Sequence, residues 1–184
     1  ESAVLSSFSR DENLVSALNA SGPLWTDLFV DPETGNKTLE FWIPVRNNPG
    51  DPALGAFVLQ IDPQTYLYPL IQSWPVSSKT AESLITRRIG DDVIFLNDLR
   101  HVPDAGLNLT ISINQQDIPA VRAARGFEGI VQGPDYRGVP VVASITPVSG
   151  TPWYLVAKVD AEEVYEPIHI FFYQVAGTLL LFLL

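Results

Sequence analysis

One strand–turn–strand pattern occurs twice in the chain, and this repeat restricts the fold more than any other feature. Phe57–Asp62 matches Leu155–Asp160 in pattern, and a proline lies seven residues after the aspartate in both copies. Upstream, a glycine precedes a Pro-Val pair by nine residues in both copies, at Gly35 and Gly138. Each copy therefore reads turn, strand, Pro-Val, turn, strand ending in Asp, helix. We interpret this shared order as two related modules.

The two copies differ in what precedes the repeat. The second has a strand pair before it, Ser83–Ile89 and Val93–Asn97, then a helix over about 115–125. With three later strands, Gly129–Gly133, Val139–Val148 and Trp153–Val159, this predicts an α+β module, a five-stranded antiparallel sheet with helices on one side. The first copy has only the three later strands and is incomplete. Those three strands are Trp25–Val30, Thr38–Val45 and Leu54–Ile61, and a short helix follows Pro63. The second copy also has a short strand, Leu107–Ile113.

These elements divide the chain into four expected segments. Apolar residues at helical spacing predict a long N-terminal helix over Ser2–Ala20, which Ser21-Gly22-Pro23 ends. The segments are then an N-terminal helix at 1–22, an incomplete distal module at 23–78, a proximal module at 79–166, and the start of a transmembrane helix at 167–184.

The last segment is predicted from an uninterrupted apolar run. Ile168–Leu184 contains no Asp, Glu, Lys or Arg, and its polar residues lie near its start. About 17 residues is the lower limit for a helix that spans a bilayer. We expect the beginning of a transmembrane helix that leads to a cytoplasmic part outside this sequence. A buried C-terminal core helix is the alternative.

Composition excludes several functions. The chain has 21 Asp and Glu residues against 11 Lys and Arg, a formal net charge of −10, which disfavours nucleic acid as a partner. It has no Cys, so disulfides, thiolate nucleophiles and zinc knuckles are excluded. The two His residues, His101 and His169, are too few and too far apart for a standard metal site. We expect no cofactor, no metal and no catalytic residues, because neither a nucleophile elbow nor a phosphate loop is present.

Longer stretches of the second half resemble a known family. They resemble the PAS-like (Cache or PDC type) sensor domains outside the membrane of bacterial and archaeal receptors, and they are Arg87–His101, Gly133–Ala143 and Thr151–Asp160. Ile61–Pro75 is similar to the link between two tandem modules of that family, and the likeness covers Thr26–Pro167. The resemblance implies a small ligand between the sheet and the helical segment, and an output domain such as a histidine kinase or diguanylate cyclase.

Candidate ligand-binding residues lie where the strands end. The Tyr136 ring and the Arg137 guanidinium could contact a carboxylate ligand, although Asp135 and Gly138 beside them are ordinary turn residues. The resemblance places Arg100 and His101 at a pocket rim; a solvated Arg100 paired with Asp98 or Asp104 is the alternative. Arg88 and Asn97 lie on strands and could face either the pocket or solvent. The full expected set is Arg88, Asn97, Arg100, His101, Tyr136 and Arg137.

The sequence thus predicts the extracytoplasmic sensory domain of a transmembrane receptor, itself not an enzyme. A small solute would bind the proximal module and shift the last strand, which leads into the membrane helix. Receptors of this class usually act as dimers, so we expect a homodimer in the cell membrane. A membrane-anchored binding or adhesion module without signalling output is the alternative.

Overall fold

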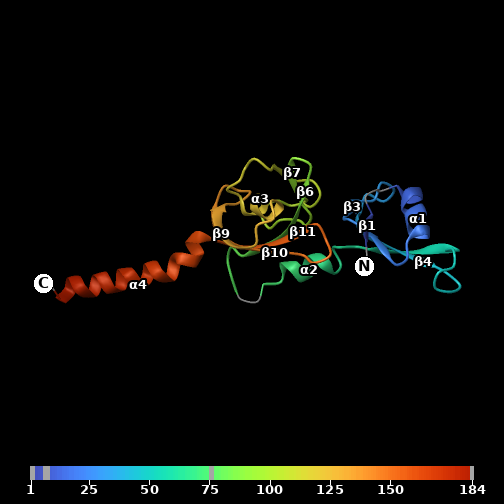
Figure 1. Ribbon diagram of the computed structural model, residues 1–184. Helices are drawn as coiled ribbons and strands as arrows, with labels where there is room; N and C mark the ends of the chain where they lie inside the picture. Colours follow the sequence, from blue (N-terminus) through green and yellow to red (C-terminus); the bar gives the residue numbers. More distant parts are fainter. Residues whose placement is uncertain (1–2, 6–8, 75–76, 183–184) are drawn as a thin grey trace. The chain divides into compact units, whose positions relative to one another are not determined.

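The chain folds into two compact units. The structure is a computed structural model that describes residues 3–5, 9–74 and 77–182 (Figure 1). Residues 1–71 belong to an N-terminal unit, and residues 72–148 and 152–184 belong to a C-terminal unit. Each contains one sheet with a helix packed on one face, antiparallel except for the parallel pair β1–β2, so the α+β class expected from the sequence is confirmed.

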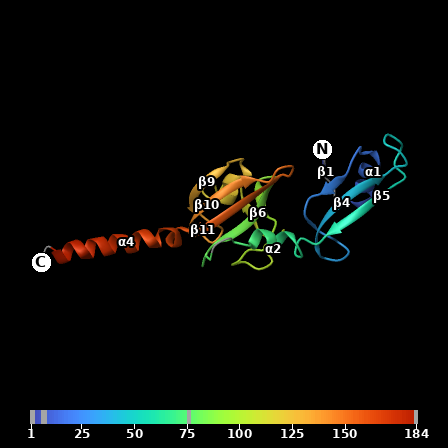
Figure 2. The same ribbon diagram turned by 90° about the horizontal axis from the view of Figure 1, so that it is seen from below.

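The C-terminal unit is built on a six-stranded antiparallel sheet with the order β8-β7-β6-β11-β10-β9. Figure 2 shows β6, β11, β10 and β9 side by side. The five expected strands are present, and the expected short strand adds a sixth at the edge. The strands are β6 (Glu82–Ile89), β7 (Asp92–Phe95), β8 (Thr110–Ser112), β9 (Gly129–Pro134), β10 (Pro140–Pro147) and β11 (Trp153–Asp160).

One face of this sheet is covered by helix α3 (Pro119–Ala124) and the segment that precedes it. Successive strand residues point to opposite faces, so alternate residues of β6 and β11 share the covered face. The register pairs Leu84 with Val156, and both are buried in the core under α3. The same register pairs Glu82 with Lys158, which puts these two charged residues on the covered face as well.

The N-terminal unit has a smaller sheet in which β4 is the central strand. Helix α1 (Arg10–Asn19) packs on β4 and β5, where Ala17 and Trp42 form a small core. Helix α2 (Leu67–Gln72) follows the sheet. The strands are β1 (Ala3–Leu5), β2 (Leu24–Thr26), β3 (Phe29–Val30), β4 (Lys37–Val45) and β5 (Gly55–Ile61).

The long N-terminal helix predicted over Ser2–Ala20 is wrong in its first part. Ala3–Leu5 forms β1 instead, paired in parallel with β2, and the helix is α1 alone. Short apolar segments of this kind fit helix and strand equally well by periodicity, and pairing with β2 decides the outcome here. Of the remaining residues, Ser9 and Ala20 flank α1 as its cap residues, and residues 2 and 6–8 lie outside the described part of the chain.

Helix α4 (Ala161–Phe182) follows β11 without an intervening loop. Its first turns contact β10 and β11, and every side chain from Glu166 to Leu179 is exposed. Pro167 lies inside the helix. No helix within the described ranges is both long and apolar enough to cross a membrane.

The close packing of the segment before α3 against strand β9 gives a test of this fold. A Cβ atom on Gly133 of β9 would lie 2.1 Å from the Asp117 carbonyl oxygen. Gly133→Ala should therefore lower the free energy of unfolding by about 1–3 kcal/mol, since the backbone must move apart. Gly55→Ala on β5 is the matched control, because nothing lies within 4 Å of its Cβ position. Equal melting temperatures for the two variants would contradict this packing.

Candidate functional site

A cluster of buried charges lies on the covered face of the C-terminal sheet. The Lys158 side chain is only 1% exposed, and its Nζ lies 2.7 Å from Glu82 Oε2 and 2.7 Å from Asp135 Oδ2. The two carboxylate side chains are 5% and 2% exposed. A buried cation held by two carboxylates avoids the desolvation cost of an unpaired charge. We call Glu82, Asp135, Lys158, Tyr136 and Arg137 the charged cluster.

Turn geometry places Asp135 in the charged cluster. Its Oδ1 accepts the backbone N–H of Arg137 at 2.8 Å and of Val139 at 3.3 Å, which closes the turn between β9 and β10. Gly138 has a φ of 79°, a conformation that favours glycine. Asp135 and Gly138 thus have the structural role that turn chemistry predicts. The second oxygen, Oδ2, is left for Lys158 and for Arg137 Nε at 2.7 Å.

Tyr136 joins the cluster through both its hydroxyl group and its ring. The hydroxyl donates to the Glu82 carboxylate, 2.9 Å from Oε2. The ring packs edge-on against Phe95, and Lys158 Nζ lies 5.0 Å from the ring centroid. The Arg137 guanidinium links the cluster to the end of β11, because its Nε donates to Asp135 and its Nη2 donates to Asp160.

The pKa shifts in the cluster follow from burial and from these partners. Burial alone raises the pKa of Asp135, but the hydrogen bonds and charges of Lys158 and Arg137 outweigh it and lower that pKa. The pKa of the Tyr136 hydroxyl is raised by burial and by the Glu82 carboxylate. Asp135 therefore stays ionised and Tyr136 stays protonated, so the cluster presents a carboxylate and a hydroxyl with fixed states.

Two spaces adjoin the cluster. A small inner cavity under α3 has a volume of about 10 Å³, near the minimum for one water molecule, and Asp135, Tyr136 and Lys158 are its polar lining. A larger outer groove of about 730 Å³ lies between the 111–118 segment and the 134–138 turn. Asp135, Tyr136 and Ile118 line both spaces, so they form the wall between groove and cavity.

The groove is polar and acidic. Its lining residues include Asp117 and Asp135, the amide-bearing residues Asn114, Gln115 and Gln116, and apolar residues. Within the described ranges, no Lys or Arg is among its lining residues. This composition favours a positively charged or neutral group in the groove over a carboxylate group.

The structure brings only part of the expected ligand-binding set together. Tyr136 and Arg137 lie in the charged cluster. Arg100 contributes its backbone N–H, 2.6 Å from Glu82 Oε1, while its guanidinium donates to the Ala81 carbonyl. The backbone of His101 hydrogen-bonds the Tyr136 hydroxyl, and its side chain is exposed.

Arg88 and Asn97 lie away from the cluster. Asn97 is fully buried and uses its amide on the backbone, accepting from Ile85 N–H at 2.7 Å and donating to Ser83 and Asp98. Arg88 is exposed and bonds Gly90 and Asp91 at the β6–β7 turn. The side-chain bonds of both residues join parts of the protein to each other.

Glu82 and Lys158 were missed from the sequence. A lysine in the otherwise apolar run Trp153–Val159, at an alternating position that shares a face with Val156, was the available signal. The partner could not be identified, because it comes from β6, 76 positions away along the sequence. Only the strand register supplies that pairing.

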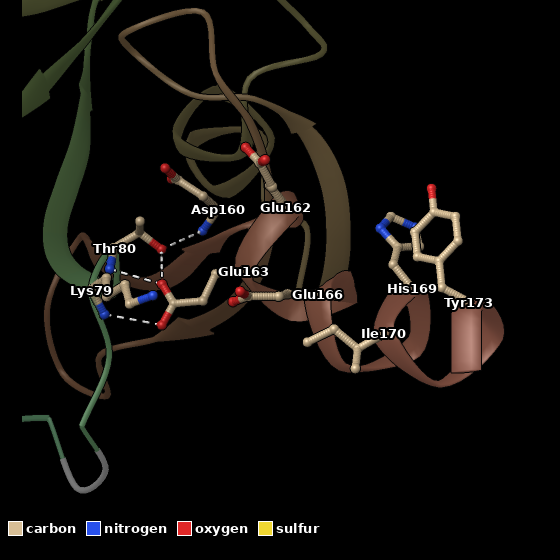
Figure 3. Close-up of a pocket in the computed structure, with 9 residues that line it drawn as sticks. All are labelled: Lys79, Thr80, Asp160, Glu162, Glu163, Glu166, His169, Ile170 and Tyr173. Atoms are coloured by element: carbon tan, nitrogen blue, oxygen red, sulfur yellow. Dashed lines mark hydrogen bonds between the residues drawn. The ribbon is translucent and has the colours of Figure 1, made fainter. Parts of the chain in front are cut away.

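The first turn of α4 is fixed to the body of the C-terminal unit by Glu163. One carboxylate oxygen accepts from Ser78 Oγ at 2.9 Å and from Lys79 N–H at 3.0 Å. The other accepts from the N–H of Thr80 at 2.9 Å and from its hydroxyl. Figure 3 shows Glu163 reaching from the helix to this segment. We call this contact the helix anchor; hydrogen bonds from the Thr80 hydroxyl and the Lys79 N–H lower the pKa of Glu163 to about 2.

Solved structures with a similar fold are sensor domains. The ligand-binding domain of the Pseudomonas aeruginosa PAO1 amino acid chemoreceptor PctB with L-Arg matches with a TM-score of 0.58 and 18% identity, over 90% of this chain and 62% of that chain. The ligand-binding domain of Mlp24 with asparagine matches with a TM-score of 0.58 and 16% identity, over 90% and 62%. The extracellular domain of mmHK1S-Z2, assigned as a histidine kinase, matches with a TM-score of 0.57 and 18% identity, over 86% and 58%.

The fold is therefore that of extracytoplasmic ligand-binding domains of chemoreceptors and histidine kinases, and the resemblance expected from the sequence is confirmed at the level of the fold. The chain spans about 60% of the length of these structures. No protein-family model matches the chain, and no curated protein sequence matches it significantly.

Removing the buried Lys158 ammonium should lower the stability of the protein. Lys158→Met leaves Glu82 and Asp135 buried without their shared partner, so we expect a loss of about 3–5 kcal/mol in the free energy of unfolding. Lys79→Met, at an exposed side chain, is the control and should leave stability unchanged. Denaturation curves of both variants measure the difference; a Lys158→Met variant as stable as the control would contradict the buried pairing.

The helix anchor predicts a pH dependence. An unfolded Glu carboxyl has a pKa of 4.5, and the folded value is about 2, so the anchor stabilises fully above 4.5 and is lost as the pH falls through 2. The melting-temperature difference between the natural chain and Glu163→Gln should be constant above about pH 5.5 and shrink between about pH 4.5 and 2. Glu162→Gln, at an exposed neighbouring position, should show no such pH dependence; a constant difference down to pH 2 for Glu163→Gln would rule out the anchor.

Proposed function

We propose that this chain is the extracytoplasmic sensory part of a signalling receptor, and that a small solute with an ammonium group binds the outer groove of its C-terminal unit. The observation that carries this proposal is the wall shared by groove and cavity. There Asp135 Oδ2 already accepts from the cations Lys158 and Arg137, and the groove beyond has Asp117 and three amide residues in its lining but no Lys or Arg among its described lining residues. An ammonium group is the complementary partner for such a surface.

The fold supports a sensory role rather than catalysis. The similar structures are ligand-binding domains, two of them in complex with L-Arg or asparagine. Amino acids carry an ammonium group, so they are the first solutes to test on this chain. Asp135 and Tyr136 supply the polar contacts in this proposal, and Arg137 acts behind Asp135. Arg100 and His101 hold the wall through Glu82 and the Tyr136 hydroxyl.

The last part of the proposal concerns strand β11 and helix α4, which follow the site along the chain. β11 carries Lys158 and continues directly into α4, whose exposed surface from Ile168 onward is rich in Phe, Ile and Leu. We propose that α4 leads towards the cell membrane, that an output domain beyond it receives the signal, and that the receptor acts as a homodimer. In this arrangement a shift of β11 moves the helix.

Binding of amines gives the test. L-Arginine, L-asparagine and L-serine should raise the melting temperature or give a calorimetric signal, whereas their N-acetyl derivatives should not, because acetylation removes the ammonium charge. Asp117→Asn at the exposed rim should weaken binding a few-fold, and Asp135→Asn by about tenfold or more, equal to 1.4 kcal/mol.

A control variant distinguishes the loss of a carboxylate in the groove from the loss of one negative charge anywhere on the protein. Asp91→Asn removes an equally exposed carboxylate at the β6–β7 turn, outside the groove, and should leave binding unchanged. Equal binding of the acetylated and free amino acids, or equal effects of Asp91→Asn and Asp117→Asn, would overturn the assignment of an ammonium ligand to this groove.

A further inference from the structure

We propose that a continuous chain of hydrogen bonds, Asp135–Arg137–Asp160–Thr80–Glu163, couples the outer groove to the first turn of α4. This inference rests on the proposed function in one respect, that the groove is where the solute binds. The chain of bonds itself is a property of the fold and can be tested without any solute. We call these five residues the relay.

The first half of the relay starts at the groove wall. Asp135 lines both groove and inner cavity, and its Oδ2 accepts from Lys158 Nζ and from Arg137 Nε, each at 2.7 Å. The Arg137 guanidinium is 18% exposed and bridges Asp135 to Asp160, the last residue of β11. Its planar fork fixes both carboxylates at once, which a lysine cannot do with the same geometry.

The second half runs from the end of β11 to the helix. The backbone N–H of Asp160 donates to Thr80 Oγ1 at 3.1 Å. The same hydroxyl donates to Glu163, and the Thr80 N–H donates to Glu163 Oε2 at 2.9 Å. Figure 3 shows Thr80 between Asp160 and Glu163, with both bonds drawn. The helix anchor is therefore also the end of the relay.

Competition for one oxygen makes the relay sensitive to a solute. An ammonium group that reaches Asp135 from the groove takes part of the acceptor capacity that Lys158 and Arg137 now share. The Arg137 fork must then shift towards Asp160 or release it, and either movement changes how Asp160 and Thr80 are held. The solute drives this change only as far as its affinities for the two arrangements differ.

Pro167 makes the helix start depend on the anchor. Proline has no N–H, so the Glu163 carbonyl loses the helical bond it would receive from position 167. The first turn is held instead by the Glu163 side chain and by Tyr165, whose hydroxyl accepts from Gln132 at 2.8 Å. A change at Thr80 therefore acts on a turn that the rest of α4 supports weakly.

Hydrogen exchange of the chain without solute tests the relay. The ion pairs and ring contact of the Arg137 side chain are with Asp135, Asp160 and Tyr136, so within the described ranges Arg137→Gln removes no such contact with α4. We expect amide exchange in residues 165–170 to become about tenfold faster in Arg137→Gln, and to return in part in Arg137→Lys. Arg88→Gln, at an exposed arginine paired with Asp91, is the control and should leave this region unchanged.

A double-mutant cycle separates coupling from general loosening. If the relay transmits, Arg137→Gln and Glu163→Gln act on one path, and the double variant should exchange no more than about twice as fast as Glu163→Gln alone. Additive effects of the two substitutions, or unchanged exchange at 165–170 in a folded Arg137→Gln variant, would overturn the relay.

Repeating the hydrogen-exchange experiment with an added amino acid tests the relay separately from the proposed ligand site. L-Arginine or L-serine should change exchange at 165–170 in the natural chain, and this response should disappear in Arg137→Gln although calorimetry still detects binding. If neither amine binds, the proposed function fails while the solute-free cycle still decides the relay. If an amine binds and the response survives in Arg137→Gln, the relay is wrong and the ligand site stands.

Discussion

The buried ammonium of Lys158 is the interaction on which the C-terminal unit depends. It joins β6, β11 and the β9–β10 turn at one point, through Glu82 and Asp135. A buried ion pair contributes little net stability, because desolvation cancels most of the attraction, but it tolerates no missing partner. Its effect is therefore to fix one register and one turn position. The wall between groove and cavity takes its shape from that requirement.

The N-terminal unit shows what the same framework does without this lysine. Gln60 stands two residues before the closing aspartate, as Lys158 does in the second copy, and its amide donates to the buried Glu40 at 2.9 Å. Trp42 Nε1 donates to the other Glu40 oxygen at 3.0 Å. Asp31 closes the equivalent turn, as Asp135 does, by accepting the N–H of Glu33 at 2.8 Å. The turn and strand roles are thus shared, whereas the buried cation belongs to the C-terminal unit.

Local signals in the sequence predicted the fold well. Turn residues around Gly138 and alternation in β10 and β11 placed these strands within one or two residues, because both signals act between neighbours along the chain. The strand Ala3–Leu5 was missed because its state is decided by pairing with β2, not by its own pattern.

The site was predictable only where a turn positions it. Tyr136 and Arg137 follow a turn aspartate and were identified from that spacing. Glu82 and Lys158 meet across a strand pairing of high sequence separation, which no local pattern reports. Asn97 was chosen as a polar strand residue, yet its side chain satisfies buried backbone groups, a demand that appears only when neighbouring strands are in place.

Strand β11 continues into helix α4 without a loop, so a displacement of the strand would reach the helix directly. A flexible linker would absorb a displacement of the strand, but here Asp160 ends the strand and Ala161 begins the helix. The same residue is bonded from two sides, by Arg137 at its carboxylate and by Thr80 at its N–H. Glu163, one turn on, is bonded to the same threonine. The proposed relay thus ends at a helix start that shares Thr80 with the end of β11 and in which the Glu163 carbonyl receives no N–H from position 167.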